Sequence, residues 1–262
     1  MYKGNSPSFL DEALRSTFEQ TCPPTEVLLV LDGATTSEQQ EVIKKYAAKF
    51  PSIFKTLLLA KNVGQGPALN AGLQHCSHEL VARMDVDDIA KPHRFEKQVR
   101  LFEQNPQIDV AGSWVEEFYD TPDEIISIRK LPQTHNELWQ YAAGRCPFNH
   151  PSVMFKRSKV LACGGYELFG LLDDYLLWMK MRAAGANFYN IQESLLYFRS
   201  TKDIYKRRGG VRYAIDECKL QWMFYRRGMI GLPTAIKNIC IRFGVRVMPN
   251  RLRAFVYQKM LR

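Results

Sequence analysis

Short apolar runs alternate with helix-like stretches along the first two hundred residues, and this alternation restricts the possible folds more than any other feature. A continuous apolar run such as Val27–Leu31 is typical of a strand buried on both faces of a sheet. The stretches between the runs carry apolar residues at helical spacing. Strands and helices that alternate at this pace predict an α/β fold, with a mostly parallel sheet flanked by helices. We expect strands over 27–31, 54–59, 80–84 and from 109, and helices over 37–50, 67–74 and 95–105.

Polar and acidic residues directly follow three of the predicted strands. Asp32 ends the first strand, Asn62 follows the second, and the stretch from Asp85 to Asp88 follows the third. Ligands of open α/β sheets bind at the carboxyl ends of the strands. We therefore expect these side chains to converge on one edge of the sheet.

The composition excludes several classes of protein. Of the 262 residues, 46% are hydrophobic and 24% are charged, a globular balance that disfavours wholesale disorder. No apolar run approaches the roughly 20 residues that a membrane-spanning helix needs, and the first residues do not resemble a signal peptide. The six cysteines are scattered without a CxxC pair, which is typical of reduced thiols in a cytosolic protein.

The charge is distributed unevenly along the chain, whose formal net charge is +9. Residues 201–262 contain 15 Lys and Arg residues and three acids, a local charge of +12, whereas residues 1–200 sum to −3. We therefore expect a domain over 1–200 and a basic helical extension over 201–262. Such an asymmetry indicates a polyanionic partner, either an anionic membrane surface or a nucleic acid.

The pattern within the extension favours the membrane. An apolar arc at helical spacing follows Pro233, and aromatic residues gather around Trp222. An apolar face with a basic rim and aromatic residues is typical of a helix that lies in the headgroup plane. The alternative is a terminal helix pair whose apolar face packs on the domain, and nucleic acid is disfavoured because no nucleic-acid motif accompanies the charge. The arc comprises Ile236, Ile239, Cys240, Phe243 and Val247, flanked by Lys237, Arg242 and Arg246.

Asp85 and Asp87 form the first motif that indicates chemistry. Alternate residues of an extended backbone point the same way, so the two carboxylates are presented together. Two like charges this close are poorly tolerated without a cation. Mg²⁺ or Mn²⁺ prefers oxygen ligands, would neutralise the pair and would also hold a diphosphate. A solvated acidic turn is the alternative, but the position after an apolar strand favours a metal site.

Asp173 and Asp174 open an amphipathic helix and form the second motif. The helix macrodipole favours acids at this end, so helix capping alone would explain them. A carboxylate directed into a cleft would instead take a proton from a hydroxyl as a general base. His150 precedes a proline that restricts its backbone, and Gly165 belongs to a glycine pair that permits a tight turn.

Six ordered blocks over about residues 1–200 together resemble the family 2 glycosyltransferases. The blocks are Asp-Gly after the strand at 27–31, NxGxGxxLNxGL, ARMDVDD-xx-xPxRFE, NHPSVMF, GGY and DDYLLW. The resemblance is greatest to the bacterial branch that builds capsule, exopolysaccharide or O-antigen units, the amylovoran-type transferases among them. It implies the GT-A fold, a nucleotide-sugar donor, a divalent metal and inversion of the anomeric carbon.

The resemblance also implies a role for each matching residue. Asp174 would be the base that acts on the acceptor hydroxyl, and Asp87, together with Asp85, would bind the metal that grips the diphosphate. The other implied positions are Asp32, Asn62, Arg83 and Asp85 on the nucleotide, and His150, Gly165, Asp173 and Trp178 on the acceptor side.

The implied partners are a nucleotide sugar, by family habit a UDP-sugar, and a polyprenyl-diphosphate-linked saccharide at the inner face of the cytoplasmic membrane. The chain begins at the Tyr-Lys-Gly turn that usually follows the first strand of this family, so we expect that strand to be absent. This keeps open a non-catalytic nucleotide-sugar-binding or scaffold subunit. A Rossmann oxidoreductase is disfavoured because Pro67 follows Gly64-Gln65-Gly66 where GxGxxG would continue, and a nucleotidyltransferase fits the Asp173-Asp174 pair less well.

Overall fold

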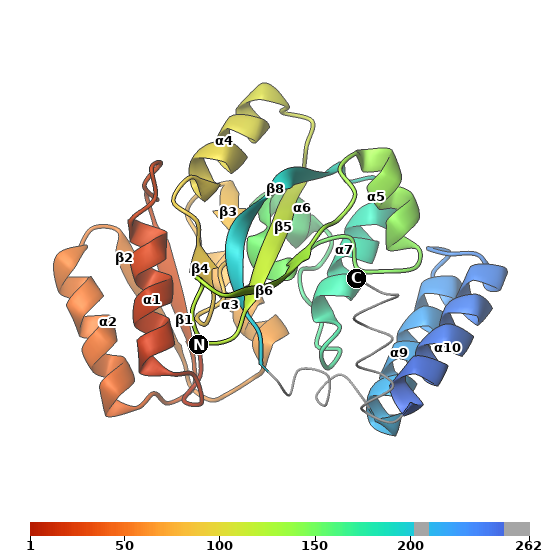
Figure 1. Ribbon diagram of the computed structural model, residues 1–262, viewed down its shortest axis with the longest axis horizontal. Helices are drawn as coiled ribbons and strands as arrows, with labels where there is room; N and C mark the ends of the chain where they lie inside the picture. Colours follow the sequence, from red (N-terminus) through yellow and green to blue (C-terminus); the bar gives the residue numbers. More distant parts are fainter. Residues whose placement is uncertain (202–209, 249–262) are drawn as a thin grey trace.

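The computed structural model describes residues 1–201 and 210–248 as an α/β body with a helical hairpin at one end (Figure 1). The predicted alternation is confirmed, with element bounds that differ from the expected ones by a few residues. The strands are β1 (Val27–Asp32), β2 (Phe54–Leu59), β3 (Leu80–Ala82), β4 (Ile89–Ala90), β5 (Val110–Phe118), β6 (Ile125–Arg129), β7 (Met154–Lys156) and β8 (Phe188–Arg199). The helices are α1 (Pro7–Phe18), α2 (Ser37–Lys49), α3 (Gln65–His75), α4 (Arg94–Gln104), α5 (His135–Ala142), α6 (Arg157–Ala162), α7 (Asp173–Ala183), α9 (Val211–Arg226) and α10 (Leu232–Val247), with a 3₁₀ turn at His150–Ser152.

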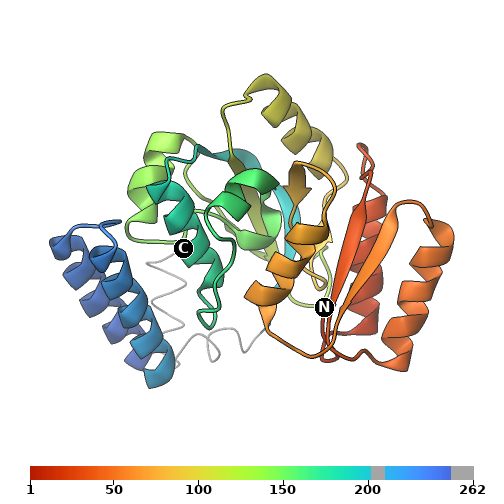
Figure 2. The ribbon, with the colours of Figure 1, turned by 180° about the vertical axis from the view of Figure 1, so that it is seen from behind.

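The described strands form two sheets. β1 and β2 pair in parallel, with α1 and α2 on one face of the pair (Figures 1 and 2). The larger sheet has the order β3-β7-β5-β8-β4, with β6 paired to β5. Its β5–β8 ladder is parallel, whereas the β3–β7, β5–β7, β4–β8 and β5–β6 ladders are antiparallel. The α/β prediction is confirmed, but the pairing is mixed and not mostly parallel. One reason is that β6 follows β5 through a short turn, which permits only an antiparallel pair.

Helix α7 is buried on two sides and fixes the position of its own first residues. Leu176, Leu177 and Trp178 are fully buried. One core cluster joins α7 to β5, β7 and β8, and another joins it to α9 and α10. A helix that is apolar around most of its surface belongs inside a fold. Asp173 and Asp174, at its amino end, therefore stand on a rigid element.

The described part of the predicted extension is an antiparallel hairpin of α9 and α10, at the end of the molecule opposite to β1 and β2 (Figures 1 and 2). The predicted helix after Pro233 is confirmed as α10. Arg242 and Arg246 do not form an outer rim beside the apolar arc. They turn inward, because both ion-pair with the buried Glu217 of α9. Within residues 1–201 and 210–248, no helix has the length and hydropathy to span a membrane. The boundary at residue 200 stays a prediction.

A cavity of about 600 Å³ lies between β1 and β3, the neighbouring edges of the two sheets. Apolar side chains of β1, α3 and β3 line most of it, among them Leu29, Leu73 and Val81. Met1 lies at one end of this gap. Its ammonium donates to the Val30 carbonyl at 2.8 Å, and its own carbonyl accepts from the Asp32 amide at 2.7 Å. Met1 thus begins a ladder along β1, and no strand of the described residues continues it.

Candidate active site

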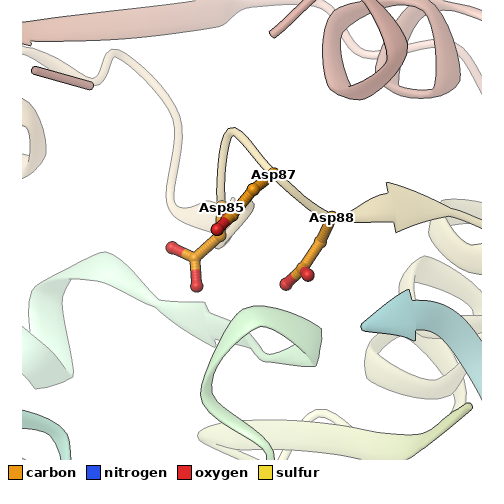
Figure 3. A group of neighbouring side chains, drawn as sticks. All are labelled: Asp85, Asp87 and Asp88. Atoms are coloured by element: carbon orange, nitrogen blue, oxygen red, sulfur yellow. The ribbon is translucent and has the colours of Figure 1, made fainter. Parts of the chain in front are cut away.

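Three carboxylates gather on the turn between β3 and β4 (Figure 3). Oxygen atoms of Asp85, Asp87 and Asp88 all lie within 4.8 Å of one another. Figure 3 shows the carboxylates of Asp85 and Asp88 directed to the same side of the turn. The sequence predicted Asp85 and Asp87 as metal ligands and did not assign Asp88, although a third acid directly after Asp87 was the available signal.

The electrostatics of this cluster fit a divalent cation. Burial, then the charge of Asp85, raises the pKa of Asp87. Burial raises the pKa of Asp88 well above its ordinary value, and the charges of Asp85 and Asp87 add to the effect. The Asp88 Oδ2 atom is buried and has no hydrogen-bond partner among the described residues. Hard oxygen ligands with an unsatisfied atom of this kind are a suitable donor set for Mg²⁺ or Mn²⁺.

Two arginines hold the acidic turn in place. Arg83 ion-pairs with Asp85 and donates from Nε to the His150 Nε2 atom at 3.1 Å. Arg199, at the end of β8, donates its amide to Asp88 Oδ1 at 2.8 Å and its Nε to the Asp87 carbonyl at 2.9 Å. The turn is therefore fixed from two sides before any ligand binds.

Asp32 and Asn62 meet beyond the ends of β1 and β2. The Asp32 carboxylate accepts from the amides of Val63 at 2.7 Å and Gly64 at 3.1 Å, and Asn62 donates to the Asp32 carbonyl at 3.2 Å. These bonds fix the loop that leads into α3. Asp32 and Asn62 thus meet as the strand ends predict, while the contact of Asp32 with a nucleotide base stays a prediction.

The acid pair at the start of α7 has two different surroundings. Asp173 is buried and accepts from the Phe169 amide, and burial is the main cause that raises its pKa. Its carboxylate also lies against Gly66, where an added Cβ atom would come within 2.9 Å of Oδ2. Asp174 is half-buried, lies 3.8 Å from the Cys146 sulfur and lines a second cavity of about 510 Å³. Asp173 thus fixes loops, whereas Asp174 has access to a cavity.

His150 lies between the acid cluster and α7. Burial, then the charge of Arg83, lowers its pKa, while the charges of Asp174 and Asp85 oppose this. Burial raises the pKa of Tyr166, and the charges of Arg83, Asp174 and Asp85 act on this side chain as well. The His150 ring packs beside Tyr166 and Trp178, and Trp178 is on α7, so contacts through Arg83 and His150 connect the Asp85 turn to the helix of Asp174. The Nδ1 atom of His150 is buried and has no partner among the described residues.

Gly165 and Trp178, also predicted on the acceptor side, lie where close packing accounts for the residue type. Gly165 has a φ of +64°, and an added Cβ atom would lie 2.3 Å from the Asn70 Oδ1 atom, so only glycine fits. Trp178 is fully buried in the core beside Phe148 and His150 and lines neither cavity. Packing therefore accounts for Trp178, because its side chain has no surface that an acceptor reaches.

Residues 4–165 match the family model of glycosyl transferase family 2. One relative, the UDP-Gal:alpha-D-GlcNAc-diphosphoundecaprenol beta-1,3-galactosyltransferase of Escherichia coli, is 42% identical over 262 residues, all of this chain and 94% of the relative. Another, the amylovoran biosynthesis glycosyltransferase AmsE of Erwinia amylovora, is 34% identical over 259 residues, which are 99% of this chain and 96% of the relative.

Solved structures of glycosyltransferases share the fold at 17% sequence identity. The S. aureus TarS complex with UDP-GlcNAc has a TM-score of 0.67 and covers all of this chain and 74% of that chain. The mannosyltransferase PcManGT of Pyrobaculum calidifontis, in complex with GDP-Man and Mn²⁺, has a TM-score of 0.62 and covers all of this chain and 79% of that chain. The predicted GT-A fold is confirmed by these likenesses. With the family match and the two relatives, they show that this chain is a glycosyltransferase that belongs to glycosyl transferase family 2.

Proposed function

We propose that this glycosyltransferase moves a sugar from a UDP-sugar to a saccharide linked through a diphosphate to a polyprenol, with inversion of the anomeric carbon. The donor and acceptor classes follow those in the name of the relative with 42% identity, which the chain matches over its whole length. The single observation that carries the mechanism is that Arg83 contacts both Asp85 and His150, while the His150 ring packs beside Trp178 of α7, the helix that Asp174 helps to open.

The acid cluster has the task of holding the donor diphosphate. Asp85, Asp87 and Asp88 would supply the oxygen ligands for Mn²⁺ or Mg²⁺, which when bound would provide positive charge next to the departing UDP. Arg83 fixes Asp85, and Arg199 fixes the backbone of Asp87, so that the ligands need little rearrangement. The nucleotide then lies along Asp32, Asn62 and Arg83, as the sequence predicted.

Asp174 acts as the general base. It accepts the proton of the acceptor hydroxyl while the hydroxyl oxygen attacks the anomeric carbon and the bond to the diphosphate oxygen breaks. One base and one charge-neutralising site are sufficient for a single displacement, which inverts the anomeric carbon. A retaining double displacement would require an additional carboxylate nucleophile.

The enzyme works at the inner face of the cytoplasmic membrane as a peripheral protein, where its lipid-linked acceptor resides. The outer surface of the α9–α10 hairpin supports this placement. Trp222 of α9 is 48% exposed, and Ile236 and Phe243 of α10 are 52% and 43% exposed. The basic side chains of Arg212, Arg226 and Lys237 have no acidic partner among the described residues. Exposed apolar residues beside unpaired cations are typical of a surface that contacts anionic lipid.

The proposal is tested by calorimetric titration of UDP and then GDP, with and without Mn²⁺, followed by a transfer assay with a UDP-hexose. Metal-dependent binding of UDP and transfer to a diphosphate-linked acceptor are the expected results. Metal-dependent binding without turnover on any acceptor would favour the non-catalytic subunit. Binding of neither nucleotide would contradict both.

A further inference from the structure

The second cavity, of about 510 Å³, lies between the body and the α9–α10 hairpin and has Asp174 in its wall. The body contributes residues around Gly144 and Leu172, and the hairpin contributes residues of both helices. Among the described residues, its charged lining consists of the cations Arg145, Lys237, Arg242 and Arg246 and the acids Asp174 and Glu217, whose formal charges sum to +2.

Two of these cations are held in place by a buried carboxylate. Glu217 is 1% exposed and accepts from Arg242 Nη1 at 2.6 Å and from Arg246 Nε at 2.6 Å. Burial alone would raise the pKa of Glu217, but the hydrogen bonds and charges of Arg246 and Arg242 outweigh it, so the pKa is lowered and Glu217 stays ionised. One carboxylate therefore orients two guanidinium groups. Arg242 is further fixed because it donates to the Gly144 carbonyl at 2.6 Å.

The remaining wall of the cavity suits an alkyl chain. Leu171 and Leu172 line it from the loop before α7, and Ile241 and Val245 line it from α10. The cavity wall thus contains cations, apolar side chains and the Asp174 carboxylate. A ligand that matches this set has an anionic group joined to an apolar chain, with a hydroxyl-bearing part near Asp174.

We propose that this cavity binds the diphosphate of the lipid-linked acceptor, with Arg242, Arg246 and Lys237 as its cationic partners. The assignment rests on the proposed function, because it takes the acceptor of that reaction as the ligand. A diphosphate diester carries a charge of about −2 and is attracted to a wall with more cations than acids, and phosphate oxygens accept charge-assisted hydrogen bonds from ammonium and guanidinium groups. The diphosphate places the acceptor sugar beside Asp174, and the first carbons of the lipid follow the apolar wall.

The donor diphosphate is a less suitable occupant of this cavity. The carboxylates of Asp85, Asp87 and Asp88 are not part of its lining. A donor diphosphate bound here would lie away from the cluster that neutralises its charge. The molecule therefore has two anion sites, one that depends on metal and one built from side-chain cations.

Direct binding in the presence of EDTA tests the assignment, because the chelator disables the donor site. The probe is decyl diphosphate below its critical micelle concentration, titrated calorimetrically into the full chain, with decyl phosphate as the comparison. We expect the diphosphate to bind more tightly than the monophosphate. Lys237→Gln should weaken diphosphate binding by about tenfold and bring the two affinities closer together. Arg242→Lys keeps the charge but loses the paired geometry, and should weaken binding by a smaller factor.

Lys219→Gln is the matched control, because Lys219 is an exposed lysine of α9 outside the cavity and should leave the affinity unchanged. The assignment is overturned if decyl diphosphate does not bind the metal-free protein, or if Lys237→Gln and Lys219→Gln have the same effect. Circular dichroism of each variant separates misfolding from loss of the site. If the probe binds as expected but no acceptor is glycosylated, the proposed function fails while the anion site stands.

Discussion

Asp174 and Asp87 are both carboxylates of the proposed site, but their surroundings differ. Asp174 lines the cavity beneath the α9–α10 hairpin, next to Cys146. Asp87 lies on a turn with two other acids, and burial and the charge of Asp85 raise its pKa. A base and a metal ligand require such different settings, and substitution of each should affect a different kinetic constant.

We expect Asp174→Asn to lower kcat by about 10²–10⁴-fold with little change in the affinity for UDP and Mn²⁺, because the amide cannot accept the proton. Asp87→Asn should instead weaken metal-dependent UDP binding. Steady-state kinetics and calorimetry on the two variants measure both constants. If both variants lose nucleotide binding to the same extent, the division of roles is wrong.

The raised pKa values of Asp87 and Asp88 predict a link between metal binding and pH. The metal-free protein keeps a proton on this cluster at a pH where an ordinary aspartate has lost it. Because Mn²⁺ must displace that proton, the affinity for Mn²⁺ with UDP should rise with pH through the raised pKa and level off above it. Calorimetry in buffers of different ionisation enthalpy reports the proton release. Asp88→Asn should reduce the release, and a pH-independent affinity with no proton release would contradict the prediction.

The sequence predicts the individual residues of this site only where they follow strands or open a helix. Asp32, Asn62 and the Asp85–Asp88 stretch were expected at one sheet edge because each follows an apolar run. Glu217, Arg242 and Arg246 were not expected to form an ion-pair cluster. Glu217 and Arg246 are 29 residues apart in the chain and lie on different helices, and helical periodicity does not indicate which face of each helix turns inward.

At the scale of elements, the α9–α10 hairpin packs Leu220 and Phe224 against the body and still leaves other apolar side chains exposed on its outer surface. Asn238 and Arg246 of α10 are buried, whereas Ile236, Phe243 and Val247 are exposed. Val211, Ile215 and Trp222 of α9 are exposed as well. Packing on the body therefore does not account for the apolar arc that the sequence predicts.

This arrangement predicts that aspartates on the outer surface of the hairpin prevent membrane binding without unfolding the protein. Ile236→Asp and Phe243→Asp together should reduce co-sedimentation with phosphatidylglycerol-containing vesicles by about tenfold or more, since they add charge to an apolar contact. Leu58→Asp, at a 64% exposed residue of β2, is the matched control and should bind as the unaltered protein does. Equal sedimentation of all three proteins would contradict the prediction, and a dimer in solution would indicate a protein partner for this surface.

At the scale of the whole molecule, the division into two sheets is the feature with the largest consequence for stability. β1 has β2 on one side, and on the other side only Met1 pairs with it among the described residues. Across the 600 Å³ cavity, β1 and β3 are not paired with each other, and among the described strands none pairs with the edges that face it. The order of strands and helices was predictable from apolar runs. The cavity between β1 and β3 was not predictable, because register and sheet order depend on contacts between distant segments.

The gap predicts that an extended apolar segment joined ahead of Met1 stabilises the molecule. Such a segment continues the ladder that Met1 begins with Val30 and Asp32, buries apolar side chains between β1 and β3, and turns a buried ammonium into a neutral amide. Burial and the charge of Arg83 already lower the pKa of that ammonium, so the charged form is unfavourable there.

A six-residue extension of alternating valine and threonine should raise the midpoint of thermal unfolding by about 5–10 °C. A glycine-serine extension of equal length is the control, because it supplies the amide without the apolar side chains. Equal midpoints for the two extended proteins would show that the cavity between β1 and β3 does not accept a strand. A higher midpoint together with tighter UDP binding would show that filling this cavity also strengthens the donor site.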